Sequence, residues 1–148
     1  MAGLYGEHDY SVDPKGRISL PTNWREELRD GVMFTLGQDR CIYVYPLADW
    51  DQAAAKLEDL DVALRENRDY RRMVFGNAQP SRLDEQGRLV IPRRLRDKAD
   101  LGKQAKAIGN RSHVELWSKE AWERRAPAVE ERYTSGALIP EGLRGGGA

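Results

Sequence analysis

Two short stretches of the chain each place an aspartate four residues before an arginine, with a glycine directly ahead of that arginine. The two sets are Asp13, Gly16 and Arg17, and Asp84, Gly87 and Arg88. An arginine carries a planar fork of N–H donors, which fits phosphate oxygens or the acceptor edge of guanine. A carboxylate at this spacing can also hold the guanidinium across a turn as a local ion pair. The residue types therefore leave two roles open for both arginines: contact with DNA, or a purely structural pair with the aspartate.

The two stretches are parts of one longer repeat. Residues 12–31 read VDPKGRISLPTNWREELRDG, and residues 83–102 read LDEQGRLVIPRRLRDKADLG. The prolines and the apolar positions match as well, which indicates two copies of one supersecondary unit. If these units pack about a pseudo-twofold axis, Arg17 and Arg88 occupy equivalent places beside it. A paired arginine site of this kind suits a double helix better than a single small substrate.

Each copy must fold into elements that present its arginine. Residues 10–20 have the pattern of a strand, a tight turn and a second strand, and Gly16 supplies the positive φ that such a turn needs. The residues that end the strand and then the following helix recur in both copies: Pro21 and Pro92, then Gly31 and Gly102. Proline favours the first helical turn, and glycine favours a helix C-terminus.

A second hairpin is expected after each of these short helices. In the first copy it joins residues 32–36 to residues 41–45, and in the second it joins residues 105–108 to residues 113–117. These runs are apolar and rich in β-branched and aromatic residues. Each unit therefore has the order β-β-α-β-β. The expected fold class is α+β, mainly β, with the two units forming a pseudo-twofold β-barrel.

Further helices are predicted at residues 47–60, 62–75 and 118–125 from apolar spacing near 3.6 residues. Ser118 is the expected N-cap of the last one, and Pro127 is expected to interrupt it. We divide the chain into a first unit at 5–47, a helical connector at 48–75, a second unit at 76–118, a C-terminal helix at 119–134 and a disordered tail at 135–148.

The composition bounds the class of protein. The chain has 148 residues, enough for one compact domain or two intimate halves. No apolar run approaches the roughly 20 residues of a membrane span, and the N-terminus lacks the layout of a signal peptide. The single cysteine, Cys41, excludes an internal disulfide and is expected to be a buried strand residue. We therefore expect a cytoplasmic protein.

The formal net charge is zero, but the charge is unevenly distributed. Residues 1–64 hold 6 Lys and Arg against 12 Asp and Glu, whereas residues 65–106 hold 12 against 6. Local potential, not the total charge, steers a polyanion such as DNA. The basic block includes the second copy of the repeat, which favours nucleic-acid binding over an evenly solvated surface.

The sequence offers little to an enzyme. It has no Walker loop, no nucleotide-binding glycine fingerprint, no HExxH and no GxSxG. His8 and His113 are the only histidines, and His113 is expected to have a packing role. We expect no catalytic site, no cofactor and no metal.

Basic residues near the two turns form the candidate DNA-contacting set. These are Lys15, Arg17, Arg82, Arg88 and Arg96, whereas Asp13, Gly16, Asp84 and Gly87 are assigned to the structure of the turns. For Arg25 and Arg96, on the helices, a solvated or ion-paired role is the simpler interpretation. Arg96 is nevertheless kept in the set because it belongs to the cluster around Arg88.

A second basic stripe recurs at helical spacing, formed by Arg65, Arg68, Arg71 and Arg72. It is compatible with further phosphate contacts, or with a subunit interface where it meets the acidic residues of 49–61. The interface interpretation is slightly favoured.

The two motifs DPKGRISLP and DEQGRLVIP, each followed by a helix, resemble the SpoVT/AbrB-type swapped-hairpin unit. Two tandem units, the connector YPLADWDQAAAKLEDL and the ending VELWSKEAW resemble the MraZ family. The resemblance covers residues 5 to 133. It implies a bacterial transcriptional repressor of the division and cell-wall gene cluster that binds short direct repeats of double-stranded DNA in its own promoter. It also implies a ring-like homo-oligomer associated with the nucleoid.

Within that resemblance the DxxxR positions fall on Asp13 with Arg17 and on Asp84 with Arg88. The basic residue inside the first motif is Lys15, whereas the second motif has Gln86 there. The two copies are therefore expected to contact DNA differently.

Three other functions compete with that of a DNA-binding repressor. The main alternative is an oligomeric protein–protein interaction module in which DxxxR is purely structural. An antitoxin, with a tail that captures a toxin, ranks lower because the tail is short and glycine-rich. An enzyme ranks last.

Overall fold

The computed structural model describes residues 3–144. The first unit and its helices comprise β1 (Glu7–Ser11), β2 (Arg17–Ser19), α1 (Thr22–Glu27), β3 (Val32–Leu36), η1 (Gln38–Arg40), β4 (Ile42–Pro46), η2 (Leu47–Asp49), α2 (Trp50–Glu58) and α3 (Arg65–Gly76). The second comprises β5 (Gln79–Ser81), β6 (Arg88–Val90), α4 (Arg93–Lys98), β7 (Gln104–Gly109), β8 (Val114–Ser118), α5 (Lys119–Thr134) and η3 (Glu141–Leu143). The α+β class and the β-β-α-β-β order of both units are confirmed.

The strands form a six-stranded sheet and a two-stranded ribbon. The order in the large sheet is β1-β7-β8-β4-β3-β5, and the ribbon pairs β2 with β6. Exchanging the two units reverses this order into itself, which is the signature of a pseudo-twofold axis. The strands that flank each turn therefore pair with the other unit, since β1 pairs with β7 and β5 pairs with β3. Among the described strands β1 and β5 are the ends of the large sheet.

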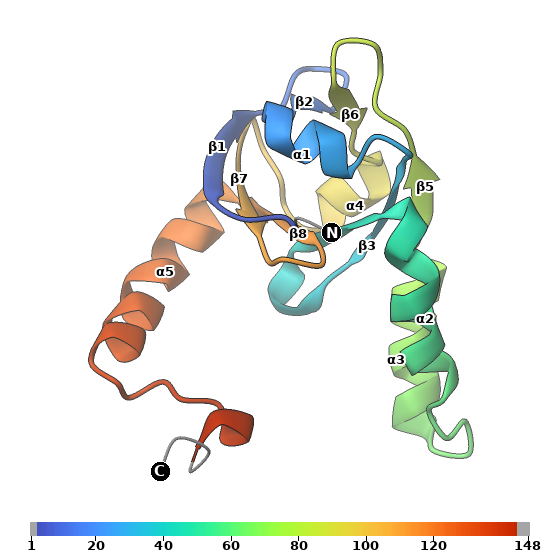
Figure 1. The fold of residues 1–148 in the computed structure, drawn as a ribbon, viewed down its shortest axis with the longest axis vertical. Helices are drawn as coiled ribbons and strands as arrows, with labels where there is room; N and C mark the ends of the chain where they lie inside the picture. The colour runs from blue at the N-terminus through green and yellow to red at the C-terminus, as the bar shows by residue number, and fades with distance from the viewer. Residues whose placement is uncertain (1–2, 145–148) are drawn as a thin grey trace.

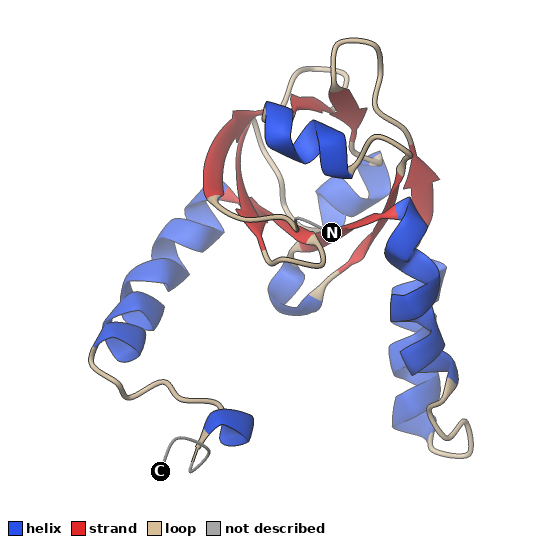
Figure 2. Ribbon diagram, viewed as in Figure 1, coloured by secondary structure: helices blue, strands red, loops and turns tan. Residues whose placement is uncertain are grey.

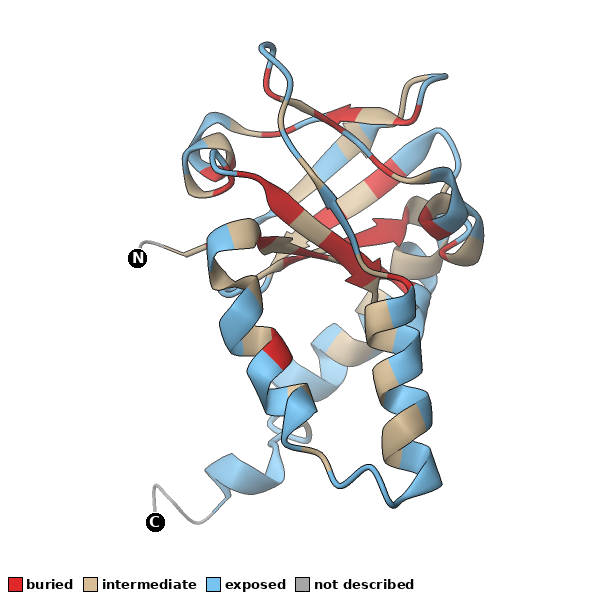
Figure 3. Ribbon diagram, turned by 90° about the vertical axis from the view of Figure 1, so that its right-hand side faces the viewer, coloured by how far each residue is buried: buried red, intermediate tan, exposed pale blue. Residues whose placement is uncertain are grey.

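The core lies between the large sheet, the ribbon and the helices α1 and α4. Both units supply it, with Ile18 and Leu89 from the ribbon and Trp24 and Leu95 from the two helices. Red segments of the strands and helices in Figure 3 surround this interior. These helices have six residues each, too short to be stable alone, so the packing of their buried faces holds them.

Two helical arms extend from the strand-rich body, on the side away from the ribbon (Figures 1 and 2). One arm is the pair α2 and α3, and the other is α5. The hydroxyl of Thr35 on β3 donates to the carbonyl of Val74, which ties α3 to the sheet. No helix of residues 3–144 has the length and apolar character needed to cross a bilayer.

Two local expectations are wrong. The last helix runs unbroken from Lys119 to Thr134, with Pro127 inside it. Proline removes one N–H, and Glu123, whose carbonyl loses that partner, is exposed, so water can take its place. In the second unit the left-handed residue after the helix is Asp100 (φ 55°), not Gly102. Aspartate tolerates that conformation, and the N–H of Leu101 closes the end on Arg96.

Two other expectations concern single segments. Cys41 is buried beside β4, as its apolar surroundings indicated. The tail at 135–148 is exposed over most of its described part and contains the short η3, while residues 145–148 lie outside the described residues. Disorder of this tail stays a prediction.

Candidate nucleic-acid interface

The β2–β6 ribbon presents both motif arginines on one face. Ile18 stands opposite Leu89, and both side chains point into the core. Neighbouring residues in a strand point the other way, and opposite residues in an antiparallel pair share a face. Arg17, opposite Val90, and Arg88, opposite Ser19, therefore lie diagonally across the outer face. This face lies at the end of the body away from the helical arms (Figure 1).

Each motif aspartate organises the turn ahead of its arginine. One carboxylate oxygen of Asp13 accepts the backbone N–H groups of Lys15 (2.9 Å) and Arg17 (2.8 Å). The other accepts Nε of Arg17 at 2.6 Å. Asp84 repeats the arrangement with Gln86 (2.9 Å) and with Arg88 (backbone 2.9 Å, Nε 2.7 Å). The aspartates thus fix both the turn and the direction of the guanidinium.

The ion pair uses only one edge of each guanidinium. Within residues 3–144 the terminal nitrogens of Arg17 make no hydrogen bond, and those of Arg88 make one, from Nη2 to Oε1 of Gln86 at 3.3 Å. The structural and DNA-contacting roles are therefore compatible, because the aspartate orients the arginine and leaves its outer donors open. The two copies differ where the sequence does, since Lys15 has no such contact with Arg17.

The pKa values of Asp13 and Asp84 are both lowered from the ordinary value of an aspartate. At Asp13 the main cause is the hydrogen bond from the backbone N–H of Arg17, with its side chain as a lesser cause. We expect an NMR titration to place the pKa of Asp13 below 3.8, and Arg17→Ala to recover only part of the shift, because alanine keeps the N–H. In that variant Asp84 serves as the internal control and keeps its lowered pKa. A full return of Asp13 to its ordinary pKa would contradict this account.

The same shift fixes the sign of one pH effect. Because the folded-state pKa of Asp13 lies below its ordinary value of 3.8, which the unfolded chain retains, the contribution of Asp13 to stability is complete above pH 3.8. It is lost as the pH falls through the folded pKa.

Gly16 and Gly87 sit at the tips of the two turns with φ of 81° and 75°. A Cβ on Gly16 would lie 2.6 Å from Cζ of Arg96, and one on Gly87 would lie 2.7 Å from Cζ of Arg25. Each turn is thus covered by an arginine from the helix of the other unit.

We expect Gly16→Ala to destabilise the protein by about 1–3 kcal/mol, because it combines left-handed backbone strain with a clash against Arg96. The free energy of unfolding in urea measures this. Gly102→Ala is the matched control, since open space surrounds Gly102. Equal stability of the two variants would show that the turn accepts a side chain.

The other predicted site residues lie around this surface to different extents. Lys15 is exposed in the first turn, and Arg82 is exposed directly after β5. Arg96 donates through Nε to the carbonyl of Ile91 at 3.1 Å and lies on the first turn. Arg25 is in the equivalent place on the second turn. The sequence reasoning did not predict this position for Arg25, although the alignment of Arg25 with Arg96 in the repeat could have indicated it.

The basic stripe on α3 is separate from the ribbon. Arg68 donates to the carbonyls of Val62 and Ala63, and Arg72 pairs with Asp69 at 2.8 Å. Arg71 lies over the ring of Phe75, 5.7 Å from its centroid. Among the described residues no ion pair joins this stripe to the acids of 49–61. The stripe lies on an arm directed away from the ribbon (Figure 1), so one chain is not expected to use both surfaces on one straight duplex.

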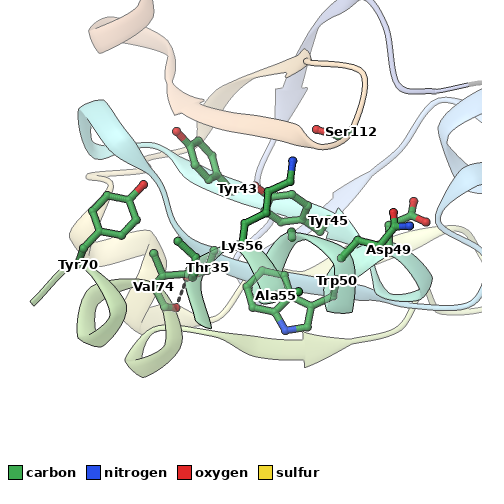
Figure 4. Close-up of a pocket in the computed structure, with 13 residues that line it drawn as sticks. Thr35, Tyr43, Tyr45, Asp49, Trp50, Ala55, Lys56, Tyr70, Val74 and Ser112 are labelled. Carbon is green, nitrogen blue, oxygen red and sulfur yellow. Dashed lines mark hydrogen bonds between the residues drawn. The ribbon is translucent and has the colours of Figure 1, made fainter. Parts of the chain in front are cut away.

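An aromatic groove of about 940 Å³ separates the α2–α3 arm from the sheet. Figure 4 shows Tyr43, Tyr45 and Trp50 along it, with Tyr70 at one end.

The ring of His113 stacks on Tyr45 with centroids 4.9 Å apart, and burial lowers the pKa of His113. Burial thus favours the neutral form of the His113 ring, which packs against Tyr43 and Tyr45 as expected for it.

Comparison with known proteins identifies the family. A family model described as "MraZ protein, putative antitoxin-like" matches residues 4–73 and again residues 74–133. The chain belongs to the MraZ family. The boundary between the two matches falls near the end of α3, so each MraZ match holds one β-β-α-β-β unit and the helices that follow it.

Several MraZ relatives cover most of the chain. A protein of Pelotomaculum thermopropionicum is 42% identical over 118 residues, which are 80% of this chain and 81% of the relative. One of Roseiflexus castenholzii is 38% identical over 125 residues, 84% and 87% of the two chains. One of Pediococcus pentosaceus is 37% identical over 140 residues, 93% and 98%. Each is named "Transcriptional regulator MraZ", in agreement with the expectation that the chain is not an enzyme.

Proposed function

We propose that this chain is a sequence-specific, DNA-binding transcriptional repressor that uses the outer face of the β2–β6 ribbon. One observation carries the proposal: Arg17 and Arg88 lie diagonally on that face, each oriented by an aspartate through one edge of its guanidinium. Their remaining donors have the fork geometry that phosphate oxygens or guanine accept. Transcriptional regulation is also the function named for the MraZ relatives.

Of the set that the sequence indicated, Lys15, Arg17, Arg82 and Arg88 are the proposed DNA contacts, and Arg96 supports them from the first turn. Lys15 and Arg82 add exposed positive charge near the two arginines, and Arg96 lies directly on the first turn. These residues belong to the proposed units at 5–47 and 76–118. One subunit offers few contacts, so tight binding by a chain of zero net charge needs several subunits on repeated sites.

We further propose that the chain assembles into a ring-like homo-oligomer. Exposed apolar side chains on the α2–α3 arm support a subunit contact there: Val62, Leu64, Tyr70 and Met73. In a ring, successive ribbons could meet successive direct repeats in the promoter of the chain's own operon. Such a protein would be found with the nucleoid.

Fluorescence anisotropy tests the proposal. The intact protein is titrated into its own upstream duplex and into a scrambled duplex of equal length, at two salt concentrations. We expect tight binding to the native duplex, weaker binding to the scramble, and loss of affinity at the higher salt because phosphate contacts release counterions. Equal binding to both duplexes would contradict sequence specificity.

The aromatic groove favours a second candidate, an oligomeric protein–protein interaction module. Its lining combines Tyr43, Tyr45 and Trp50 with the exposed Tyr70, a composition typical of interface cores. Absence of binding to either duplex would favour this function.

A further inference from the structure

A short hydrogen-bonded chain connects the first turn to the helix of the second unit. The carbonyl of Gly16 accepts the N–H of Ile91 at 2.8 Å. The carbonyl of Ile91 accepts Nε of Arg96 at 3.1 Å. The guanidinium of Arg96 then returns to the turn, where it fills the space that a Cβ on Gly16 would need. The turn that carries Arg17 is thus held by Asp13 from within its unit and by Arg96 from the other unit.

The second turn has the same support with the units exchanged. The carbonyl of Gly87 accepts the N–H of Leu20 at 3.3 Å, and the carbonyl of Leu20 accepts Nε of Arg25 at 2.7 Å. Arg25 lies against Gly87 as Arg96 lies against Gly16. The flanking sequences WREE and LRDK differ, so a shared contact made by both arginines points to a shared requirement.

The surroundings exclude the ion-paired role that the sequence allowed. Within residues 3–144 neither Arg25 nor Arg96 takes part in an ion pair, although carboxylates flank both on their helices. Both side chains are half-buried, with Nε fixed on a backbone carbonyl. Removing either would open a gap beside the glycine of the opposite turn.

We propose that Arg25 and Arg96 are positioning residues that act across the pseudo-twofold axis. Arg96 holds the turn that presents Arg17, and Arg25 holds the turn that presents Arg88. This inference rests on the proposed DNA-binding function for its effect on affinity, but the support itself is a property of the free protein. The positions of Arg17 and Arg88 therefore each depend on a side chain from the other unit.

Double-mutant cycles on operator binding test the crossed assignment. The four single variants are Arg17→Ala, Arg88→Ala, Arg25→Ala and Arg96→Ala. We expect Arg96→Ala alone to weaken binding about five- to ten-fold. Once Arg17 is already alanine, the same change should add almost nothing, because the turn no longer presents a contact. In the double variant with Arg88→Ala, the fold-loss of affinity from Arg96→Ala should multiply in full with the fold-loss from Arg88→Ala.

The pair Arg25 and Arg88 should show the same coupling, and the pair Arg25 and Arg17 should not. Coupling inside a unit, between Arg96 and Arg88, would overturn the proposal. Independent effects in all four pairs would also overturn it, and would identify Arg25 and Arg96 as direct DNA contacts.

Amide hydrogen exchange in the free protein separates this proposal from the DNA-binding function. Arg96→Ala should speed exchange at Gly16 and Arg17 and leave Gly87 and Arg88 unchanged, and Arg25→Ala should do the reverse. If either alanine variant unfolds, Arg25→Lys or Arg96→Lys replaces it, since lysine fills much of the space without the planar guanidinium. The crossed pattern without DNA binding would refute the proposed function alone. Faster exchange in the same unit, or in both turns equally, would refute the crossed support.

Discussion

Replacement of both Arg17 and Arg88 by alanine should abolish specific operator binding while the protein stays folded. Each arginine is anchored on an exposed turn and contributes no side chain to the core. Loss of one arginine should cost about 1–3 kcal/mol per site, and the proposed oligomer on repeated sites would multiply that loss. Anisotropy on the native duplex measures the affinity, and thermal melting checks the fold.

Two further variants sharpen this prediction. Arg29→Ala is the matched control, because Arg29 is exposed beyond the end of α1 and forms only a long 3.7 Å pair with Glu26. It should bind as the parent does. Arg17→Lys keeps the charge but loses the fork, so it should retain salt-dependent binding and lose discrimination between native and scrambled duplexes. Full operator affinity in the double alanine variant would end the assignment of the ribbon as the DNA-binding face.

Among the substitutions proposed, Trp24→Ala should lower the free energy of unfolding the most, by about 3–5 kcal/mol. Trp24 is fully buried at 0% exposure, and its indole N–H donates to the carbonyl of Tyr5 at 2.9 Å. The ring of His8 packs edge-on against it, with centroids 4.8 Å apart. The substitution therefore leaves a cavity in the core and an unpaired carbonyl near the N-terminal strand.

Urea unfolding at one fixed protein concentration measures this loss, since oligomerisation shifts apparent stability. Tyr133→Ala is the control, because Tyr133 is 70% exposed and its loss should change the free energy of unfolding by less than about 0.5 kcal/mol. Trp24→Phe should fall between the two, since it keeps most of the volume and loses the hydrogen bond. A loss below about 1 kcal/mol for Trp24→Ala would mean that the core closes around the vacancy.

The repeat was sufficient to predict the unit order, the short helices and the α+β class, because these follow from local periodicity and from the turn residues around Gly16. The identity of the pairing strands could not be predicted in the same way. Pairing of β1 with β7 joins residues far apart in sequence, and alternation in β1 is compatible with several partners. The same distance conceals the contact of Arg25 with Gly87.

The prediction that Pro127 interrupts α5 was wrong for a different reason. Proline in a helix interior carries a cost, and a single sequence does not reveal whether the lost carbonyl partner can be replaced by water. In this chain Glu123 is exposed, and the helix continues past Pro127. For the proposed DNA contacts, residue types and spacing indicated the two motif arginines, but not that each aspartate would leave the outer guanidinium nitrogens open.

Because the two halves of the ribbon belong to one polypeptide, they are free to differ, whereas two identical chains about a true axis are not. Lys15 is an exposed basic residue, whereas Gln86 in the matching place accepts a hydrogen bond from Arg88. The two halves of the ribbon are thus chemically different, and the ribbon has a direction. If the ribbon binds DNA as proposed, a duplex laid across it presents one order of bases to Lys15 and another to Gln86, so reversing the duplex changes the match. The protein would then distinguish the two orientations of its target along the chromosome.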